Sequence, residues 1–256
     1  MRRPGNAWLR TSFTSLLLIS LLSACASVPK DQRTESDPWE PLNRTVYSVN
    51  KGVDKVTFKP LAKGYQKVIP RPVRTGVTNF MKNLVTPRSA VNNFLQGKPR
   101  HGFTELVRFV FNSTVGLGGL IDVATAAKVE AHREDFGQTL AVWGVPSGPY
   151  VMLPFLGPAT LRDAVAWPVE IMSSLLYHYD NSSVRDKLYI LRSIELRERL
   201  FAVERLLDDS EDPYITLRES FLQNREFAIH DGNPPEDDEF FDEFFEEEYL
   251  EEEPIQ

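Results

Sequence analysis

The first 25 residues constrain this chain more than any other feature, because they predict the compartment in which it folds. Three arginines precede the apolar run 13–22, and two small residues follow it before Cys25, the only cysteine in the chain. This order is typical of a secretory signal peptide, and the apolar run is too short to span a bilayer. We therefore expect residues 1–24 to be removed on export and the remaining chain to fold without a disulfide.

The segment 22–25, Leu-Ser-Ala-Cys, resembles the lipobox of bacterial lipoproteins. The resemblance implies cleavage before Cys25, a diacylglycerol on its thiol and an acylated new amino terminus. A single myristoyl chain binds a membrane only marginally, at about 0.8 kcal/mol per buried CH₂, whereas three chains would hold permanently. Ala26, rather than an aspartate, follows the cysteine, and by analogy with enteric lipoproteins this favours the outer membrane, facing the periplasm. The alternative is an ordinary signal peptide followed by a chance cysteine.

Charge divides the mature chain into a body and a tail. The tail, residues 231–256, holds thirteen acidic residues and no Lys or Arg. Removing that tail and the three arginines of the signal from the net charge of −7 leaves the body with a charge of +3. Such a body does not repel anionic lipid headgroups. We expect the tail to be disordered, with docking of its aromatic residues on a basic partner as the alternative. Residues 25–36 predict a polar tether.

Apolar spacing in residues 37–230 predicts one mainly α-helical domain. Helical patterns cover residues 42–53, 74–84, 89–96, 102–113, 161–179, 184–207 and 213–227. Two extended runs, 139–143 and 150–155, predict a small β-hairpin around the Gly-Val-Pro-Ser-Gly turn. The helix at 102–113 is apolar around most of its circumference, so it should be buried in protein or in lipid.

Residues that could support catalysis are scattered. The chain has no nucleophile elbow and no Walker loop. His132 and Asp135 could ligate a metal, but no second cluster of ligands joins them in the sequence. The dense charge run is acidic, which argues against nucleic-acid binding. We therefore expect no enzymatic activity, no cofactor, no metal and no nucleic-acid partner.

Several long segments, in order, are similar to the MlaA (VacJ) family of outer-membrane lipoproteins. The similar segments are 37–44 (DPWEPLNR), 60–65, 72–80, 91–97, 108–124, 135–140, 143–145, 148–150, 153–154, 157–158, 161–163, and 212–214 with Arg218. They span nearly all of the expected domain and leave out the acidic tail. Because they are long and keep the family's order, the resemblance is specific.

The resemblance implies one ring-shaped helical domain, with a small β-hairpin and a central amphipathic channel, lying in the inner leaflet of the outer membrane. Proteins of this family take phospholipids misplaced in the outer leaflet and pass them to a periplasmic carrier, MlaC, which maintains lipid asymmetry. They are often found with trimeric porins. We expect phospholipids, a carrier of this kind and a porin as partners. The alternative is a scaffolding lipoprotein of the envelope that acts through its acidic tail.

The resemblance also implies six candidate residues for the lipid path. They are Leu42, Asn43, Arg44, Gly144, Gly148 and Tyr150. The first three match the early helix that borders the family's channel, and the last three lie at the glycine-rich hairpin beside it. Pro146 stands where family members often have glycine, so the hairpin should move less. Glycines permit positive φ, which favours a gating role, with a simple tight turn as the alternative.

Overall fold

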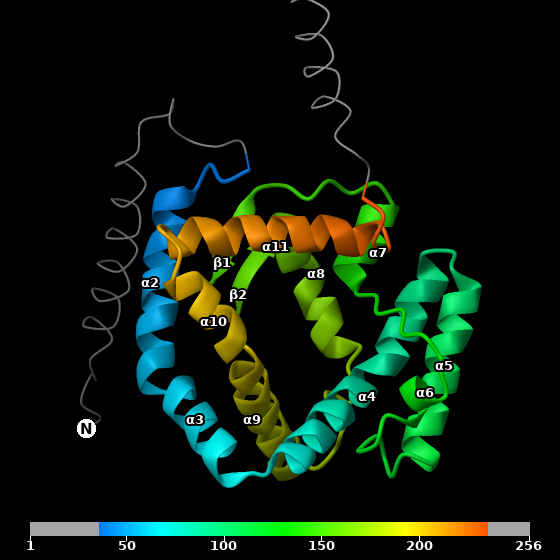
Figure 1. Ribbon diagram of the computed structural model, residues 1–256. Coiled ribbons are helices and arrows are strands. Elements are labelled where there is room, and N and C mark those ends of the chain that lie inside the picture. Colours follow the sequence, from blue (N-terminus) through cyan, green and yellow to red (C-terminus); the bar gives the residue numbers. More distant parts are fainter. Residues whose placement is uncertain (1–35, 235–256) are drawn as a thin grey trace, which may run out of the picture. The chain divides into compact units, whose positions relative to one another are not determined.

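The structure is a computed structural model that describes residues 36–234. The predicted signal peptide, Cys25, nearly all of the tether and most of the acidic tail lie outside the described residues. The chain divides into two compact units, residues 1–221 and 222–256. Figure 1 shows that the first unit is mainly helical, with one small sheet. The predicted fold class, mainly α with a β-hairpin, is confirmed.

The elements follow one another with short connections. They are α2 (Glu40–Val56), α3 (Phe58–Val68), α4 (Arg71–Leu95), α5 (Pro99–Thr114), α6 (Val123–Ala126), α7 (Phe136–Val142), β1 (Tyr150–Leu153), β2 (Gly157–Thr160), α8 (Leu161–Met172), α9 (Ser182–Arg199), α10 (Phe201–Asp208) and α11 (Pro213–Ile229). Among the described residues, side-chain oxygens cap five helix N-termini by accepting backbone N–H bonds. The capping residues are Asp122, Asp135, Thr160, Asn181 and Asp212.

Two predictions of helix boundaries are wrong, the first because a proline does not end the helix. Helix α4 continues through Pro87 and joins the two helices predicted at 74–84 and 89–96. An interior proline costs about 3 kcal/mol, and packing of α4 against α5, α7 and α9 offsets that cost. The opposite error occurs at 184–207, where the chain breaks at Leu200 into α9 and α10.

One small hairpin is present, and its first strand, β1, lies within the predicted run 150–155, but the other predicted strand is wrong. The expected strand 139–143 belongs to the end of α7 and the residue after it, because the Asp135 carboxylate accepts the Gln138 N–H at 2.8 Å and starts a helix. The hairpin instead pairs β1 with β2 in antiparallel fashion, from Tyr150 opposite Thr160 to Leu153 opposite Gly157. Strand β2 contains a proline, which a two-stranded sheet tolerates because both strands are edges.

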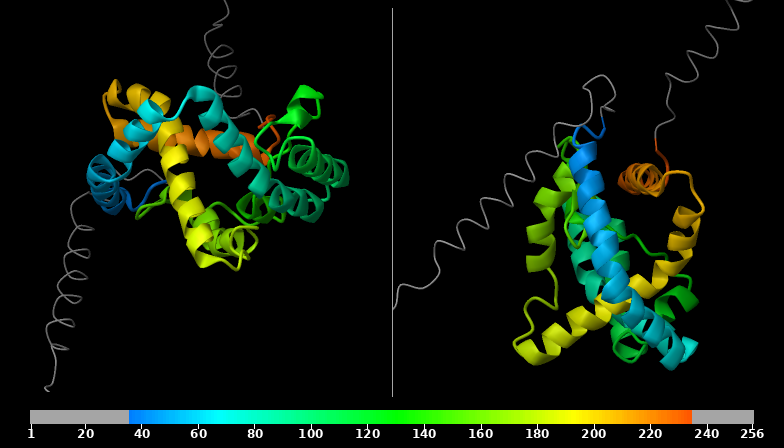
Figure 2. Two further views of the ribbon diagram at one scale, coloured as in Figure 1. Left: turned by 90° about the horizontal axis from the view of Figure 1, so that it is seen from below. Right: turned by 90° about the vertical axis from the view of Figure 1, so that its left-hand side faces the viewer.

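The elements of the first unit pack in an order that closes on itself (Figures 1 and 2). Helix α2 contacts α3, α3 contacts α9, and α9 contacts α4. Helix α4 contacts α7, α7 contacts α8, and α8 contacts β1, which returns to α2. Helix α5 lies along α4 and carries α6. The sheet therefore closes a circuit of helices that are distant in sequence.

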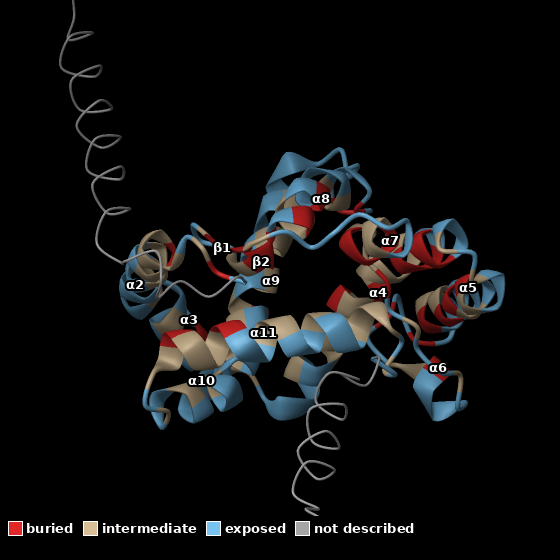
Figure 3. Cartoon of the chain, turned by 90° about the horizontal axis from the view of Figure 1, so that it is seen from above, coloured by how far each residue is buried: buried red, intermediate tan, exposed pale blue. Residues whose placement is uncertain are grey.

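Among the described residues, buried side chains are more often polar than apolar. Figure 3 shows where the buried residues lie in the fold. Seventeen buried residues are polar or charged and ten are apolar, and five of those ten are alanines. Helix α5 shows the pattern: its buried residues are Gly102, Glu105, Arg108 and Asn112. The large apolar residues Phe103, Val107 and Val110 of the same helix are exposed. The protein thus buries the polar side of this helix and leaves the apolar side for another environment. Within the described residues, no helix combines the length and hydropathy needed to cross a membrane.

The described part of the second unit, residues 222–234, comprises the last turns of α11 and the turn that ends it. The Gly232 N–H donates to the Phe227 carbonyl at 2.9 Å, and Gly232 has a φ of 89°. A glycine with positive φ is a common end for a helix, because it has no Cβ to clash. His230 Nδ1 lies 3.2 Å from Glu226 Oε1, one turn earlier.

Candidate functional site

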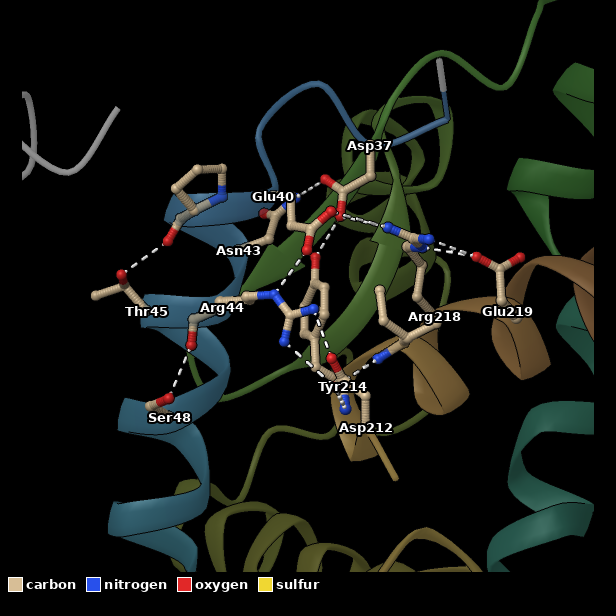
Figure 4. A network of polar contacts seen from close by, with 12 residues as sticks. Asp37, Glu40, Asn43, Arg44, Thr45, Ser48, Asp212, Tyr214, Arg218 and Glu219 are labelled. Atoms are coloured by element: carbon tan, nitrogen blue, oxygen red, sulfur yellow. Dashed lines mark hydrogen bonds and ion pairs between the residues drawn. The ribbon is translucent and has the colours of Figure 1, made fainter. Parts of the chain in front are cut away.

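Asn43 lies near the start of α2, where its amide joins three parts of the chain (Figure 4). Its Nδ2 donates to Asp37 Oδ1 at 2.8 Å and to the Tyr150 carbonyl at 3.0 Å. Its Oδ1 accepts the Met152 N–H at 2.9 Å. The side chain is 1% exposed, and both N–H groups and the carbonyl of the amide are bonded to protein. Asn43 therefore fixes β1 to α2.

Asp37 connects this amide to the start of α11. The Tyr214 hydroxyl donates to Asp37 Oδ2 at 2.5 Å, and Arg218 Nη1 lies 3.2 Å from the same oxygen. Asp37 is 0% exposed, so its charge is paired inside the protein. Burial, and then the hydrogen bond to Asp37, raise the pKa of Tyr214 above its ordinary value. The Tyr150 ring packs edge-on against Tyr214, with centroids 6.2 Å apart.

Arg44 provides a second connection between α2 and α11. Its Nη2 and Nη1 donate to the two Asp212 oxygens at 2.7 and 3.2 Å, and its Nε donates to Glu40 at 2.7 Å. The guanidinium carbon also lies 4.5 Å from the centre of the Tyr214 ring. The hydrogen bond to Asp212 raises the pKa of Arg44, and the same bond lowers the pKa of Asp212.

We call this network the N-terminal clasp. Its members are Asp37, Glu40, Asn43, Arg44, Asp212, Tyr214 and Arg218. It holds the point at which the tether enters the folded unit, because the Ser36 carbonyl accepts the Tyr150 N–H at 2.8 Å. The sequence did not predict that residues 37 and 212–218 complete this network.

The remaining predicted site residues lie apart from the clasp contacts. Leu42 is half-buried on α2. Gly144 and Gly148 lie between α7 and β1, outside the hairpin turn, with φ values of 85° and 65°. A Cβ on Gly148 would lie 3.1 Å from Leu161 Cβ, whereas one on Gly144 would meet open space. The segment between them is fastened to α8, since Arg162 Nη1 donates to the Val145 carbonyl at 3.0 Å.

A second polar region lies between α4, α5, α9 and the segment before α7. It is a cavity of about 150 Å³, which we call the cationic cavity. Its charged lining residues are Lys82, Arg133, Arg192, Arg199, Glu105 and Glu195. Sequence reasoning missed this cavity, because its charges come from separate helices. The one available signal was Lys82, a charged residue on the side of α4 that packs into the protein.

The two carboxylates of the cationic cavity are engaged. Glu105 accepts the His132 N–H at 2.7 Å, and burial raises the pKa of Glu105. Glu195 accepts the Thr78 hydroxyl at 2.6 Å and lies 2.8 Å from Arg199 Nε. Both carboxylates are 2% exposed. Their acceptor positions are therefore partly occupied before any ligand enters.

Two cations of the cavity, Lys82 and Arg192, have no carboxylate paired with them in the described residues. Lys82 and Arg192 are half-buried, and neither side chain makes a hydrogen bond or ion pair with another described residue. Burial lowers the pKa of Lys82, and the charges of Arg133 and Arg199 lower it further. Burial and then the charge of Arg88 lower the pKa of Arg192. An anion in the cavity would remove part of this electrostatic strain.

The two residues considered as metal ligands in the sequence, His132 and Asp135, do not belong to a metal-binding cluster in the described residues. Residues 36–234 contain no group of three or more His, Cys, Asp or Glu side chains placed to hold a metal ion. The His132 ring instead stacks on His101, with centroids 3.8 Å apart.

Comparison with known proteins assigns the family. A model of the MlaA lipoprotein family matches residues 35–228. The chain belongs to the MlaA family. A Shigella flexneri relative, named intermembrane phospholipid transport system lipoprotein MlaA, is 40% identical over 219 residues, with 83% of this chain and 86% of the relative covered. The Escherichia coli K12 protein of the same name is 38% identical over 233 residues, with the same coverage.

A solved MlaA-family structure supports the assignment. It is described as the structural basis for maintenance of bacterial outer membrane lipid asymmetry. It superposes with a TM-score of 0.66 at 38% identity and covers 76% of this chain and 99% of that chain. The Haemophilus influenzae MlaA protein is more distant, at 31% identity over 229 residues, with 87% of this chain and 92% of the relative covered.

Proposed function

We propose that this chain is an outer-membrane lipoprotein that removes misplaced phospholipids from the outer leaflet. It passes them to a periplasmic carrier of the MlaC kind and so maintains lipid asymmetry. The named function of the MlaA relatives, intermembrane phospholipid transport, supports this proposal. The chain covers most of each relative, so the proposal applies to the whole family domain.

The proposal rests mainly on the burial of polar side chains and the exposure of apolar ones. Exposed apolar residues follow one side of α5 and one side of α8, where Leu161, Val165 and Val169 recur at helical spacing. Such surfaces are favourable against acyl chains and unfavourable against water. Moving a charged headgroup through hydrocarbon costs several kcal/mol or more, and a polar path through a protein lowers that cost. A protein that exposes apolar side chains and buries polar ones is suited both to contact with acyl chains and to passage of a charged headgroup.

The predicted site residues take separate roles in this proposal. Leu42 and Arg44 border the lipid path, and the buried Asn43 and Tyr150 hold its frame together with the N-terminal clasp. The segment from Gly144 to Gly148 gates the path. Three acyl chains on Cys25 keep the protein on the periplasmic side of the outer membrane, where a trimeric porin binds it.

The test is the amount of phospholipid exposed on the cell surface, measured by labelling intact cells with a reagent that does not cross the outer membrane. We expect exposed phospholipid to rise when the protein is absent and to fall when wild type is restored. A Cys25→Ala variant should fail to restore it at equal abundance. Gly148→Val should also fail, because valine is strained at positive φ and approaches Leu161, whereas Gly64→Ala in open space should restore function.

An unchanged amount of surface-exposed phospholipid in cells lacking the protein would overturn the transport proposal. The scaffolding alternative would then direct attention to partners of the acidic tail. If Gly148→Val restored function fully, transport would stand and the gating role would be withdrawn.

A further inference from the structure

The cationic cavity contains more positive charge than its own carboxylates balance. Four cations and two carboxylates line one space of about 150 Å³. Arg199 and Glu195 pair at 2.8 Å, and Glu105 is held by the His132 N–H at 2.7 Å. Lys82 and Arg192 enter the space without such a partner in the described chain.

The lining comes from separate elements, so the convergence is a property of the tertiary structure. Lys82 is on α4, Arg192 and Arg199 are on α9, and Arg133 precedes α7. The Thr78 hydroxyl, on the same face of α4 as Lys82, adds a neutral polar group at 2.6 Å from Glu195. Lysine and arginine together supply the charge-assisted donors that bind phosphate oxygens.

We propose that the cationic cavity binds the phosphodiester of an anionic glycerophospholipid headgroup. This proposal rests on the proposed lipid-transport function and identifies a binding site for it. The cavity has about the volume that holds benzene in an engineered protein cavity, so a phosphate group fits and acyl chains do not. The charged lining also disfavours acyl chains, which remain outside the cavity. The excess of cations favours a headgroup without a positive charge of its own, as in phosphatidylglycerol.

Calorimetric titration of the full-length lipoprotein in a nonionic detergent tests the site. The probe is dihexanoyl phosphatidylglycerol, a short-chain lipid that dissolves as monomers. We expect Lys82→Gln/Arg192→Gln to weaken binding at least about tenfold, because the double variant removes two charge-assisted donors to the phosphate oxygens. The matched control, Lys63→Gln/Lys187→Gln, removes two exposed cations on α3 and α9 and should bind like wild type.

Two further variants keep the result interpretable if the double variant does not fold. Arg133→Gln changes an exposed side chain and should weaken binding several-fold. Lys82→Arg keeps the charge and should bind within about threefold of wild type. Unchanged binding by Arg133→Gln and by any folded Lys82→Gln/Arg192→Gln would overturn the proposal.

The same titration distinguishes a lipid headgroup from free phosphate. Glycerophosphoglycerol, the headgroup without acyl chains, should compete with the lipid, and inorganic phosphate should compete at least about tenfold less well. Equal competition by inorganic phosphate would overturn the headgroup proposal. Surface phospholipid labelling separates this proposal from the proposed function. If cells lacking the protein accumulate surface phospholipid but the folded double variant binds and clears lipid normally, only the cavity proposal fails.

Discussion

At the scale of single residues, buried polar groups determine how the folded unit is held. The two largest fully buried side chains are the tyrosines of the clasp region, Tyr150 and Tyr214, and Glu105 and Glu195 follow them. A buried polar group that loses its partner costs about 1–3 kcal/mol, so each such residue depends on its neighbours. Asn43 is the clearest case, because its amide bonds the Asp37 carboxylate, the Tyr150 carbonyl and the Met152 N–H.

We expect Asn43→Leu to lower the free energy of unfolding by roughly 3–5 kcal/mol, because it leaves three buried hydrogen-bonding groups without a partner. Thermal unfolding in detergent, followed by circular dichroism, measures the change. Gln66→Leu, at an exposed position of α3, is the control and should change stability by about 0.5 kcal/mol or less. Equal stability of the two variants would mean that the clasp does not hold α2 to β1. A loss of lipid transport in Asn43→Leu therefore reports folding before it reports lipid passage.

The Arg44–Asp212 pair makes stability depend on pH in a defined direction. The hydrogen bond from Arg44 lowers the pKa of Asp212 in the folded protein, so the folded state favours the ionised carboxylate. The contribution is fully present above the ordinary Asp value of about 4 and is lost as the pH falls through the folded pKa. The melting temperature of wild type should exceed that of Asp212→Asn at pH 6, and the difference should shrink as the pH falls below about 4. An exposed control, Asp186→Asn, should show no such convergence.

At the scale of elements, the helices pack against one another through small and polar side chains. Helix α4 buries Met81, Ser89 and Ala90 together with three asparagines, and α5 faces it with Gly102. Small residues permit close approach of helix backbones. The turn after α5 is also tightly packed, because Gly116 lies against the Ile121 and Asn112 backbone.

We expect Gly116→Ala to be strongly destabilising. A Cβ there would lie 2.2 Å from the Ile121 oxygen and 2.5 Å from the Asn112 oxygen, so backbone would have to move. The loss should be about 2–3 kcal/mol, as for other overpacked buried sites. Gly52→Ala in α2, where nothing lies within 4 Å, should be neutral or stabilise the protein by up to about 1 kcal/mol. Chemical unfolding of both variants tests this, and equal midpoints would contradict the backbone clash.

At the scale of the whole molecule, exposed apolar helix faces suit the proposed contact with lipid. They occur on α2, α3, α5 and α8, and the residues include Val56, Val68, Phe103 and Val165. Large exposed apolar surfaces are typical of membrane or protein contacts. The lipid anchor and this surface would then act together, as two signals that hold one protein on a membrane.

A protein without its anchor should therefore still bind liposomes. We expect purified Cys25→Ala protein to float with phosphatidylglycerol–phosphatidylethanolamine vesicles in a density gradient. Adding Phe103→Glu/Val110→Glu should reduce binding at least about tenfold, since each apolar side chain contributes about 1.5–3 kcal/mol when buried. Ser182→Glu/Ser183→Glu adds the same charge at the exposed start of α9 and should leave flotation unchanged. Equal loss in both would show that charge alone controls binding.

The sequence by itself determined the helical class, the approximate position of most helices and the family. Periodic apolar residues encode helices locally, as in α5 and α11, whose bounds lie close to the predicted ones. Long segments in the family's order indicated the family, and the proposed function follows from that family. The same local rules failed at Pro87, where packing of α4 against α5 keeps the helix continuous. They also failed at the predicted strand 139–143, where the Asp135 cap starts a helix.

Only the tertiary structure decided which side of each helix faces protein. Periodicity shows that a helix such as α5 has two unlike faces, but the same pattern fits an apolar core and a lipid-facing surface. The contacts of Glu105, Arg108 and Asn112 show that protein covers the polar face here. The N-terminal clasp and the cationic cavity likewise join residues more than a hundred positions apart, and no local spacing encodes such contacts.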